Sequence, residues 1–310
     1  MPELLAPAGD WDALRAAVAN GADAVYFGLE EFNARRRATN FTLAALPEVV
    51  GYLHDRNVKG YVAFNTVIFS DELERAAEYV VRIAEAGADA VIVQDLALVR
   101  LIGRIAPTLP IHASTQMTQT EPRGIEYLGS LGVRRVILAR ELSVREIGEI
   151  ARRTRVELEV FVHGALCVSY SGQCLASESL FGRSANRGEC AQACRLPYQV
   201  KDGEGRIVAH DKHVLSMKDN NQSANMRALV DAGVRSFKIE GRYKDMAYVK
   251  NITAHYRLLL DEILEARPDL AAASSGRTTL SFTPDPEQNF NREFTDYFVQ
   301  GRKEDIGAFD

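Results

Sequence analysis

The feature that most constrains this 310-residue chain is a short phrase that recurs along it. NGADAVYFG begins at Asn20 and AGADAVIVQ at Ala86, and LGVRRVILA at Leu131 and AGVRSFKIE at Ala232 vary the same pattern. In each, a helix ends at a glycine, a few residues pass, and a buried strand begins, as in a capped helix with a short connection. The repeat predicts strands that alternate with helices, and therefore a parallel sheet.

The pattern can be followed through eight strands along the chain. Eight strand–helix units indicate closure into an α/β fold of the TIM type, a (β/α)8 barrel. An open doubly wound sheet is the alternative, but no GxGxxG motif follows the first strand, which favours the barrel. The expected strands are residues 4–6, 24–27, 60–64, 90–93, 111–114, 136–139, 156–162 and 236–239.

Two segments do not fit the repeat. Residues 164–235 separate the seventh and eighth strands, and a segment of this length is far longer than an ordinary loop. We therefore expect a barrel over residues 1–265 with a functional, cysteine-rich insertion at 164–235. The insertion should contain a hairpin with Asp202 and Gly203 at its turn. Residues 266–310 are predicted to be a linker and the start of a C-terminal extension in a truncated chain.

The composition is that of a globular protein, with 46% hydrophobic and 25% charged residues. The net charge of −5 gives no overall basic signal, although a local basic patch can still bind nucleic acid. No stretch reaches the roughly 18 apolar residues of a membrane span. The opening MPELLAPAGD lacks the basic region of a signal peptide. We expect a cytoplasmic protein without membrane contact, and the sequence leaves its oligomeric state open.

All four cysteines lie in the insertion, at Cys167, Cys174, Cys190 and Cys194. In a reducing compartment, metal ligation or redox chemistry is favoured over two disulfides. Structural zinc sites usually combine two closely spaced pairs, and here only Cys190 and Cys194 form one. A 4Fe–4S cluster accepts looser spacing and is favoured, with zinc as the fallback and unligated thiols as a further alternative.

Polar residues follow most of the predicted strands. In a (β/α)8 barrel the active site lies at the carboxyl ends of the strands, so these residues should share one face. Arginines there suit a carboxylate or phosphate, because the guanidinium group is a planar fork of donors. Arg140–Glu141 and Glu240–Arg242 could instead be ion pairs that only stiffen the rim. The candidate substrate-binding residues are Asn33, Arg35, Asn65, Asp95, Gln116, Arg140, Glu141 and Lys244.

Two histidines are candidates for proton transfer. His112, on the fifth strand, could form an acid–base pair with Asp95 at the end of the fourth. His163 could be a ligand, a proton carrier or a buried core histidine. No GxSxG or HExxH motif occurs, which argues against the common hydrolases. The candidate catalytic residues are therefore Glu240, Arg242, His163 and His112.

Several stretches resemble one known family. The segment from Glu157 to Ser177, ELEVFVHGALCVSYSGQCLAS, resembles the signature of the U32 collagenase-like peptidase family. The opening ELLAPAGDWDALRAAVANGADAVYFG, the run IHASTQ and the run FGRSANRGECAQACRLPY are similar to other motifs of that family. NARRRATNFTL and SMKDNNQSANMRALVDAGVRSFKIEGRYKDM resemble most closely the branch that hydroxylates a cytidine of 23S ribosomal RNA. The resemblance covers nearly the whole chain.

The resemblance implies more than the residues alone indicate. It implies a barrel that holds a 4Fe–4S cluster on the four cysteines and hydroxylates 23S ribosomal RNA, with prephenate as the implicated oxygen source. The rim arginines would then bind the carboxylates of this co-substrate. Related branches act on the wobble uridine of tRNA and on ubiquinone precursors. The family name keeps a peptidase as an alternative, and a non-catalytic iron–sulfur accessory protein is a third. Members of the ribosomal RNA branch are usually much longer than this chain.

Overall fold

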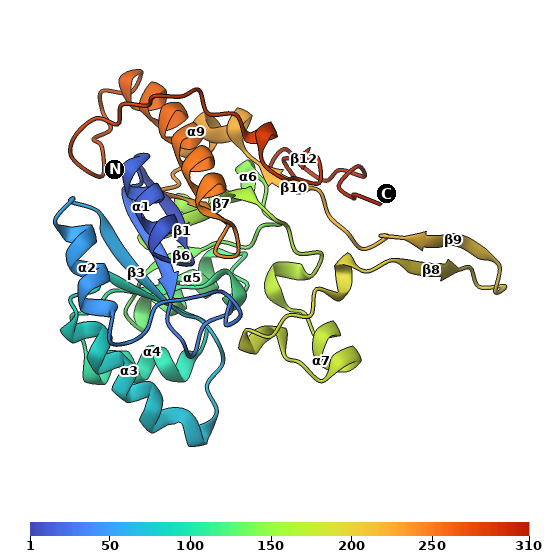
Figure 1. Ribbon diagram of the computed structural model, residues 1–310, viewed down its shortest axis with the longest axis horizontal. Helices are drawn as coiled ribbons and strands as arrows, with labels where there is room; N and C mark the ends of the chain where they lie inside the picture. Colours follow the sequence, from blue (N-terminus) through green and yellow to red (C-terminus); the bar gives the residue numbers. More distant parts are fainter. Residues whose placement is uncertain (310) are drawn as a thin grey trace.

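The computed structural model describes residues 1–309 and contains a closed barrel of eight parallel strands. Neighbours in sequence pair in order from β1 to β7, and β11 pairs with both β7 and β1, which closes the cylinder (Figure 1). The predicted (β/α)8 barrel is therefore confirmed. Its strands are β1 (Glu3–Ala8), β2 (Ala24–Gly28), β3 (Lys59–Phe64), β4 (Ala90–Val93), β5 (Ile111–Ala113), β6 (Val133–Ile137), β7 (Glu157–Gly164) and β11 (Ser236–Ile239).

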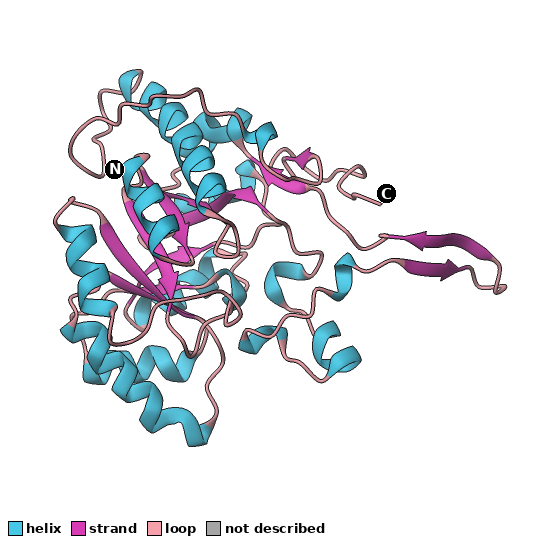
Figure 2. Cartoon of the chain, viewed as in Figure 1, coloured by secondary structure: helices cyan, strands magenta, loops and turns pink. Residues whose placement is uncertain are grey.

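Helices cover the outside of the barrel (Figure 2). Local sequence sets their first residues: Asp10 caps α1 by accepting from the Ala13 N–H at 2.8 Å, and Ser143 with Glu146 forms the predicted capping box of α6. No helix within residues 1–309 combines the length and apolar character needed to cross a membrane. The helices are α1 (Trp11–Ala19), α2 (Leu46–His54), α3 (Leu73–Glu85), α4 (Leu96–Ile105), α5 (Pro122–Ser130), α6 (Val144–Ala151), α8 (Met226–Asp231) and α9 (Met246–Glu265).

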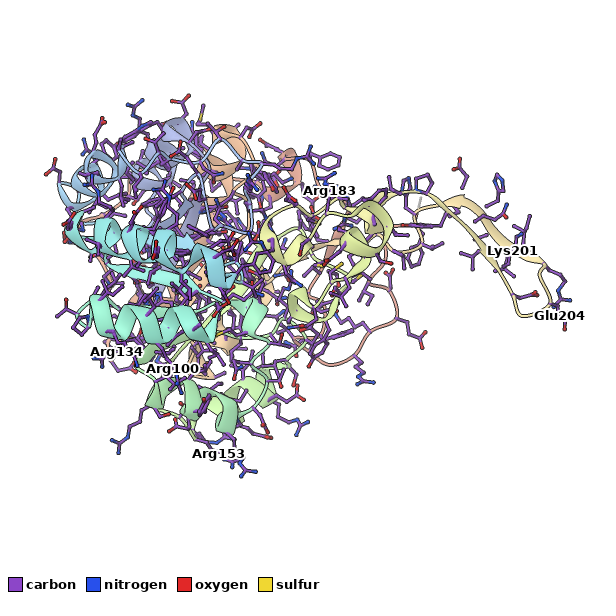
Figure 3. The ribbon with its side chains drawn as sticks, turned by 90° about the horizontal axis from the view of Figure 1, so that it is seen from below. Arg100, Arg134, Arg153, Arg183, Lys201 and Glu204 are labelled. Atoms are coloured by element: carbon purple, nitrogen blue, oxygen red, sulfur yellow. The ribbon has the colours of Figure 1, made fainter. Side chains whose placement is uncertain are left out.

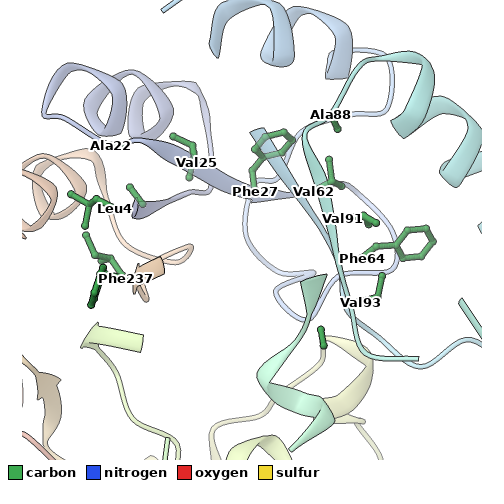
Figure 4. Packing of buried hydrophobic residues seen from close by; sticks show 14 of the residues in the cluster. Leu4, Ala22, Val25, Phe27, Val62, Phe64, Ala88, Val91, Val93 and Phe237 are labelled. Carbon is green, nitrogen blue, oxygen red and sulfur yellow. The ribbon is translucent and has the colours of Figure 1, made fainter. Parts of the chain in front are cut away.

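The main hydrophobic core lies between the strands and these helices. Successive side chains of a strand point to opposite faces, so the apolar members of each strand face the helices while the alternate residues face the barrel axis. Figure 4 shows Leu4, Val25, Phe27, Val62 and Phe237 in this outer layer. This layer fixes the barrel on which the functional loops are mounted.

The inside of the barrel is partly ionic. Arg135 pairs with Glu3 at 2.5 Å and with Glu159 at 3.4 Å, and Lys238 pairs with Glu159 at 3.0 Å. This explains the one strand that was placed wrongly. The sixth strand was predicted at residues 136–139 but begins at Val133, because Arg135 lies buried among carboxylates. The exposed Arg134 points away from the barrel (Figure 3).

The insertion leaves β7 at Gly164 and forms α7 (Ala176–Phe181) among several single turns. It then builds an antiparallel hairpin, β8 (Tyr198–Lys201) with β9 (Ile207–Lys212), which confirms the predicted hairpin. The hairpin projects away from the barrel, with Lys201 and Glu204 near its tip (Figures 1 and 3). The chain returns through β10 (Asp219–Asn221), which pairs antiparallel with the end of β7.

Residues 266–309 fold back along the barrel. The Ser274 side chain reaches Asp23 beside β2, and β12 (Phe294–Thr295) pairs with β10. The last residues also bond to the return arm of the insertion, the segment that leads from β9 into β10. The Lys218 N–H donates to the Ile306 carbonyl at 3.0 Å, and the Ala308 N–H donates to the Ser216 carbonyl at 2.8 Å. This segment therefore covers the return arm of the insertion.

Candidate functional site

Two arginines and one carboxylate form the centre of the barrel mouth. The Arg35 Nη2 donates to Glu240 Oε1 at 3.4 Å, and the Arg242 Nη1 donates to Asn33 Oδ1 at 3.3 Å. Asn33 and Arg35 come from the loop after β2, and Glu240 and Arg242 from the loop after β11. Tyr26 lies 5.6 Å from the Arg242 guanidinium carbon. Glu240 therefore pairs with Arg35, and the alternative of a Glu240–Arg242 ion pair at the rim is not observed.

Burial and neighbouring charges shift the pKa values of these two arginines and of Glu240. Burial and the neighbouring Arg35 lower the pKa of Arg242 from its usual value. Glu240 raises the pKa of Arg35. Burial acts to raise the pKa of Glu240, but Arg35 and Arg242 more than offset it, so that pKa lies below its usual value. At neutral pH the mouth therefore holds two cations and one anion.

Two amides tie the neighbouring loops together. Asn65, after β3, accepts from the Ala34 N–H at 3.0 Å and donates to Gln116 Oε1 at 2.9 Å. Gln116 also accepts from Ser114 Oγ at 3.3 Å. These residues were predicted to bind substrate, and the structure brings them together as a chain of hydrogen bonds that joins the loops after β2, β3 and β5.

The insertion is fastened to the mouth at several of these loops. Ser171 donates its backbone N–H to Glu141 at 2.9 Å and its hydroxyl to the same carboxylate, and it accepts from the Arg140 N–H at 3.2 Å. Arg187 donates to the Val67 carbonyl and to Glu72, both at 2.7 Å. Arg140 and Glu141 therefore act as anchors of the insertion.

Gly188 brings the backbone of the insertion against the mouth. Its φ is +87°, and a Cβ at this position would lie 2.4 Å from the Asn33 carbonyl oxygen. Only glycine adopts such a conformation at no steric cost while admitting a backbone so near. The segment between Cys174 and Cys190 is thus held directly against the loop that carries Asn33 and Arg35.

The four cysteines are partly buried, and Cys194 lies within electrostatic reach of the other three. Burial raises the pKa of Cys194, Arg195 partly offsets this rise, and Cys167, Cys190 and Cys174 add to it. The Gln192 N–H donates to Cys190 Sγ at 3.4 Å, a contact of the kind that tunes a bound iron–sulfur cluster. Cys190 also acts on the charge of Arg35. Four thiolates are the donor set that a 4Fe–4S cluster takes.

The thiols are not drawn together around one ion. Within residues 1–309, no group of three or more His, Cys, Asp or Glu side chains is gathered closely enough to hold a metal ion as it stands. Zinc bonds its sulfur ligands at about 2.3 Å, so a zinc site would need all four sulfurs close together. The larger 4Fe–4S cubane tolerates wider separation of its ligands. The zinc fallback and the 4Fe–4S cluster both remain predictions.

Three of the candidate residues, Asp95, His112 and Lys244, lie apart from this centre. Asp95 caps α4, accepting from the Ala97 N–H at 2.6 Å and the Ile68 N–H at 3.0 Å, and no hydrogen bond joins it to His112. His112 lies inside the barrel with its ring 4.8 Å from Tyr61. Lys244 donates to the Phe290 carbonyl at 3.3 Å, over the C-terminal segment.

His163 is a buried histidine behind the mouth. Its Nδ1 lies 3.3 Å from the Tyr256 hydroxyl, and its ring also contacts Tyr248 and Phe294. Burial, His255 and Lys244 lower its pKa to about 3. Burial likewise lowers the pKa of His112, with Arg135, Lys238 and Lys59 adding to the effect. Both rings are therefore neutral at physiological pH.

Three residues of the site were not singled out from the sequence. Tyr26 lies beneath Arg242, Tyr243 lies 5.6 Å from the Arg35 guanidinium carbon, and Arg187 ties the insertion to the loop after β3. The alternation of β2, which sends Tyr26 toward the barrel axis, could have identified the first. The distant partners of Arg187 left no signal in the sequence.

Fold and site together define a (β/α)8 barrel whose cysteine-rich insertion covers the carboxyl ends of the strands. The sequence model of peptidase family U32 matches residues 9–308, and the chain belongs to that family. A solved U32 peptidase structure superposes with a TM-score of 0.53 at 14% identity, covering 78% of this chain and 93% of that one. At this identity the likeness shows the fold alone.

Curated relatives match over most of the chain. The 23S rRNA 5-hydroxycytidine C2501 synthase of Escherichia coli K12 is 53% identical over 308 residues, which are 99% of this chain and 47% of the relative. The tRNA hydroxylation protein P1 of Bacillus subtilis is 34% identical over 266 residues, 84% of this chain and 63% of the relative. The chain thus spans about half of the first relative and under two thirds of the second.

Proposed function

We propose that this chain is the barrel portion of an iron–sulfur-dependent RNA hydroxylase that converts a cytidine of 23S ribosomal RNA to 5-hydroxycytidine. The observation that carries the proposal is the placement of Cys167, Cys174 and Cys190 within electrostatic reach of Cys194, with Cys190 also acting on the half-buried Arg35 at the mouth of the barrel. The 53% identity to the E. coli synthase extends over 99% of the chain and supports the same reaction. Such a reaction on ribosomal RNA takes place in the cytoplasm.

The thiols would hold the cluster, and the rest of the insertion would position them. Cys167, Cys174, Cys190 and Cys194 are the proposed ligands of a 4Fe–4S cluster. When bound, such a cluster supplies one-electron transfer at a potential set by hydrogen bonds and solvent exposure. Ser171 and Arg187 fix the insertion to the rim, and the Gln192 N–H donates to Cys190. These contacts would orient the proposed ligands.

A small carboxylate is the proposed co-substrate, and prephenate fits the requirement for an organic acid that carries oxygen. Arg35 and Arg242 supply the positive charge at the mouth, and Asn33 adds a polar contact. Guanidinium groups bind carboxylates through parallel N–H donors, which fixes orientation as well as adding binding energy. The role of these residues would be to hold the co-substrate beside the cluster.

The family name also supports a second candidate, a peptidase. The sequence contains no GxSxG or HExxH motif, and a cysteine nucleophile would leave three thiols without a role. A non-catalytic iron–sulfur accessory protein is the third candidate. A peptidase predicts cleavage of a protein substrate that a single point variant abolishes, and an accessory protein predicts a cluster without any RNA modification.

Mass spectrometry of 23S ribosomal RNA tests the hydroxylase directly. Deletion of the gene that encodes this chain should remove 5-hydroxycytidine from the RNA, and the wild-type gene should restore it. The Cys190→Ser variant should fail to restore it, because one proposed ligand is lost. The Arg134→Gln variant should restore it fully, because Arg134 is exposed and points away from the barrel. Unchanged hydroxycytidine in the deletion strain would remove the hydroxylase from consideration.

A further inference from the structure

The segment that joins the first two cysteines is held by hydrogen bonds more than by packing. Between residues 167 and 176 the only buried residue is Ser171, whose exposed fraction is 0%. The side chains around it face solvent, with Tyr170 52% and Leu175 67% exposed. A segment with few buried apolar contacts opens locally at little cost unless other contacts hold it. The position of both cysteines therefore depends on the polar contacts of this turn.

The turn itself has a strained backbone. Ser171 has a φ of +35°, in the left-handed region that residues other than glycine rarely adopt. Gly172 follows with a φ of +89°, and a Cβ there would lie 3.0 Å from the Gln116 Cγ, so the turn lies against the loop after β5. A residue persists in such a conformation only where its surroundings over-determine it, and these residues cluster at functional sites.

Glu141, in the loop after β6, supplies the contacts that hold the strained residue. One of its carboxylate oxygens accepts from the Ser171 N–H at 2.9 Å, and the other accepts from the Ser171 hydroxyl. The same hydroxyl accepts from the Arg140 N–H at 3.2 Å. Hydrogen bonds accepted by a carboxylate are charge-assisted and about twice as strong as neutral ones. The backbone N–H and the hydroxyl of Ser171 are thus both bound to adjacent residues of the barrel.

A second contact fixes the other side of the turn. The Gln173 Nε2 donates to the Thr118 hydroxyl at 2.6 Å and to the Gln116 carbonyl at 3.3 Å, both in the loop after β5. The turn is therefore bound to two neighbouring loops of the barrel. Ser171 lies four residues after one cysteine and three residues before the next, so opening of the turn moves both thiols.

The other cysteine pair, Cys190 and Cys194, is held by a separate set of contacts. Between them, Ala193 is only 5% exposed, and its carbonyl accepts from the Tyr198 hydroxyl at 2.8 Å. These contacts lie within the insertion and do not involve Glu141. Loss of the Glu141 carboxylate should therefore affect one half of the thiol set and leave the other half in place.

We propose that Glu141 is a positioning residue that holds Cys167 and Cys174 in place for the cluster by acting through Ser171, an arrangement here called the Glu141–Ser171 clamp. The inference deepens the proposed function and rests on it, because that function supplies the cluster. Glu141 itself would touch neither the cluster nor the substrate. Its carboxylate would keep two of the four ligands in one loop conformation, so that the loop does not open and release iron.

Hydrogen exchange measured by mass spectrometry tests the clamp on the anaerobically purified full chain. Glu141→Ala should speed exchange about 10- to 100-fold in a peptide that covers residues 168–173, because both carboxylate hydrogen bonds are lost. A peptide that covers residues 191–196 should keep its rate. Glu141→Gln retains one acceptor oxygen and should give an intermediate rate. Glu178→Ala removes an exposed carboxylate from α7 of the same insertion and should match the wild type.

The rate at which the cluster is lost tests the effect on the ligands. With EDTA as the chelator, the cluster absorbance of Glu141→Ala should decay at least about tenfold faster than that of the wild type, because the ligand loop opens more often. Glu141→Gln should lie between the two, and Glu178→Ala should decay like the wild type. A general loss of barrel stability would instead speed exchange in both peptides, so the pair of peptides separates positioning from stability.

Three results would overturn the inference: unchanged exchange of residues 168–173 in Glu141→Ala, faster exchange in both peptides, or faster exchange without faster loss of the cluster. RNA hydroxylation is scored separately. Control of cluster loss by Glu141 in a protein that does not hydroxylate RNA would reject the proposed function and leave the clamp standing. Hydroxylation by the wild type with no faster cluster loss in Glu141→Ala would reject only the clamp, and a wild type without a cluster would reject both.

Discussion

The two ends of the barrel interior use the same kinds of side chain in opposite ways. At the amino ends of the strands, Arg135 contacts Glu3, Glu157 and Glu159, and Lys238 contacts Glu159. At the carboxyl ends, Glu240 makes a single long contact with Arg35, and the buried Nε of Arg242 has no hydrogen-bond partner. The first network is closed on itself, and the second is open.

This difference distinguishes charged residues that stabilise the barrel from charged residues that are available for function. With Lys59 on Glu3, the lower network contains three cations and three carboxylates, and the Tyr61 hydroxyl also donates to Glu3 at 2.8 Å. Such a network satisfies its own hydrogen bonds and specifies a packed interior. The mouth instead retains a buried cationic donor without a partner, the Nε of Arg242.

The largest expected contrast is between matched arginine variants at the two ends. Arg135→Ala should lower the free energy of unfolding by about 3–5 kcal/mol, because it leaves buried carboxylates without a partner. Arg242→Ala should lower it by less than about 1 kcal/mol, since its few contacts contribute little. Urea denaturation followed by circular dichroism measures both. Equal losses would mean that the mouth is as structural as the lower network.

A second contrast concerns the positive charge that protonation would add to the buried histidines. His112 and His163 are buried and neutral, and the pKa of His163 is lowered to about 3. Between that value and the unfolded value near 6.5, the unfolded chain binds more protons, so stability falls as pH falls. Between pH 7 and pH 5 each histidine should cost about 2 kcal/mol of unfolding free energy.

The variant His112→Gln isolates one of these contributions. It removes a ring that faces Arg135, Lys238, Lys59 and Tyr61, so the loss of stability between pH 7 and pH 5 should be smaller by about 2 kcal/mol. The carboxylates with lowered pKa titrate below about 4.5 and lie outside this window. A variant with the same pH dependence as the wild type would show that the ring accepts a proton inside the barrel.

A third prediction concerns how tightly the insertion is held over the open end. Gly188→Ala should cost about 1–3 kcal/mol locally, because its φ of +87° disfavours a side chain and the Cβ would meet the Asn33 carbonyl. Limited proteolysis within residues 164–213 should become at least about fivefold faster. Gly182→Ala is the matched control, because its φ is also positive, at +64°, but nothing lies within 4 Å of the Cβ position. Equal sensitivity of the two variants would mean that contact with the mouth does not hold the insertion.

The smallest effect is expected on the hairpin, which belongs to neither end of the barrel. Val208 is 62% exposed on β9. Val208→Thr keeps the β-branched shape and should change the free energy of unfolding by less than about 0.5 kcal/mol. Differential scanning calorimetry measures this change. A larger loss would show that the projecting hairpin packs against a surface and contributes to stability.

The sequence predicted the barrel well because the repeat can be recognised from residues that are adjacent in the chain. Glycine-closed helices and short buried strands needed no knowledge of tertiary contacts, and the hairpin was marked by its turn at Asp202 and Gly203. The sixth strand was misplaced because Arg135 reads as a surface residue until Glu3, which lies far away in sequence, is brought beside it. The short strands β10 and β12 exist only through pairing with β7 and with each other.

The sequence predicted which residues lie together at the barrel mouth better than it predicted which of their side chains pair with each other. The carboxyl ends of the strands correctly brought together Asn33, Arg35, Glu240 and Arg242. The exchange of partners between Glu240 and the two arginines depends on loop conformation, which no local pattern encodes. Asp95 shows the same limit, because a residue at a strand end serves equally well as a helix cap.

Iron and sulfide analysis of the anaerobically purified chain, read together with its ultraviolet–visible spectrum, tests the central claim most directly. We expect a brown protein with a 4Fe–4S content of iron and sulfide, and loss of both in Cys174→Ser and Cys190→Ser. A colourless protein that carries stoichiometric zinc would contradict it.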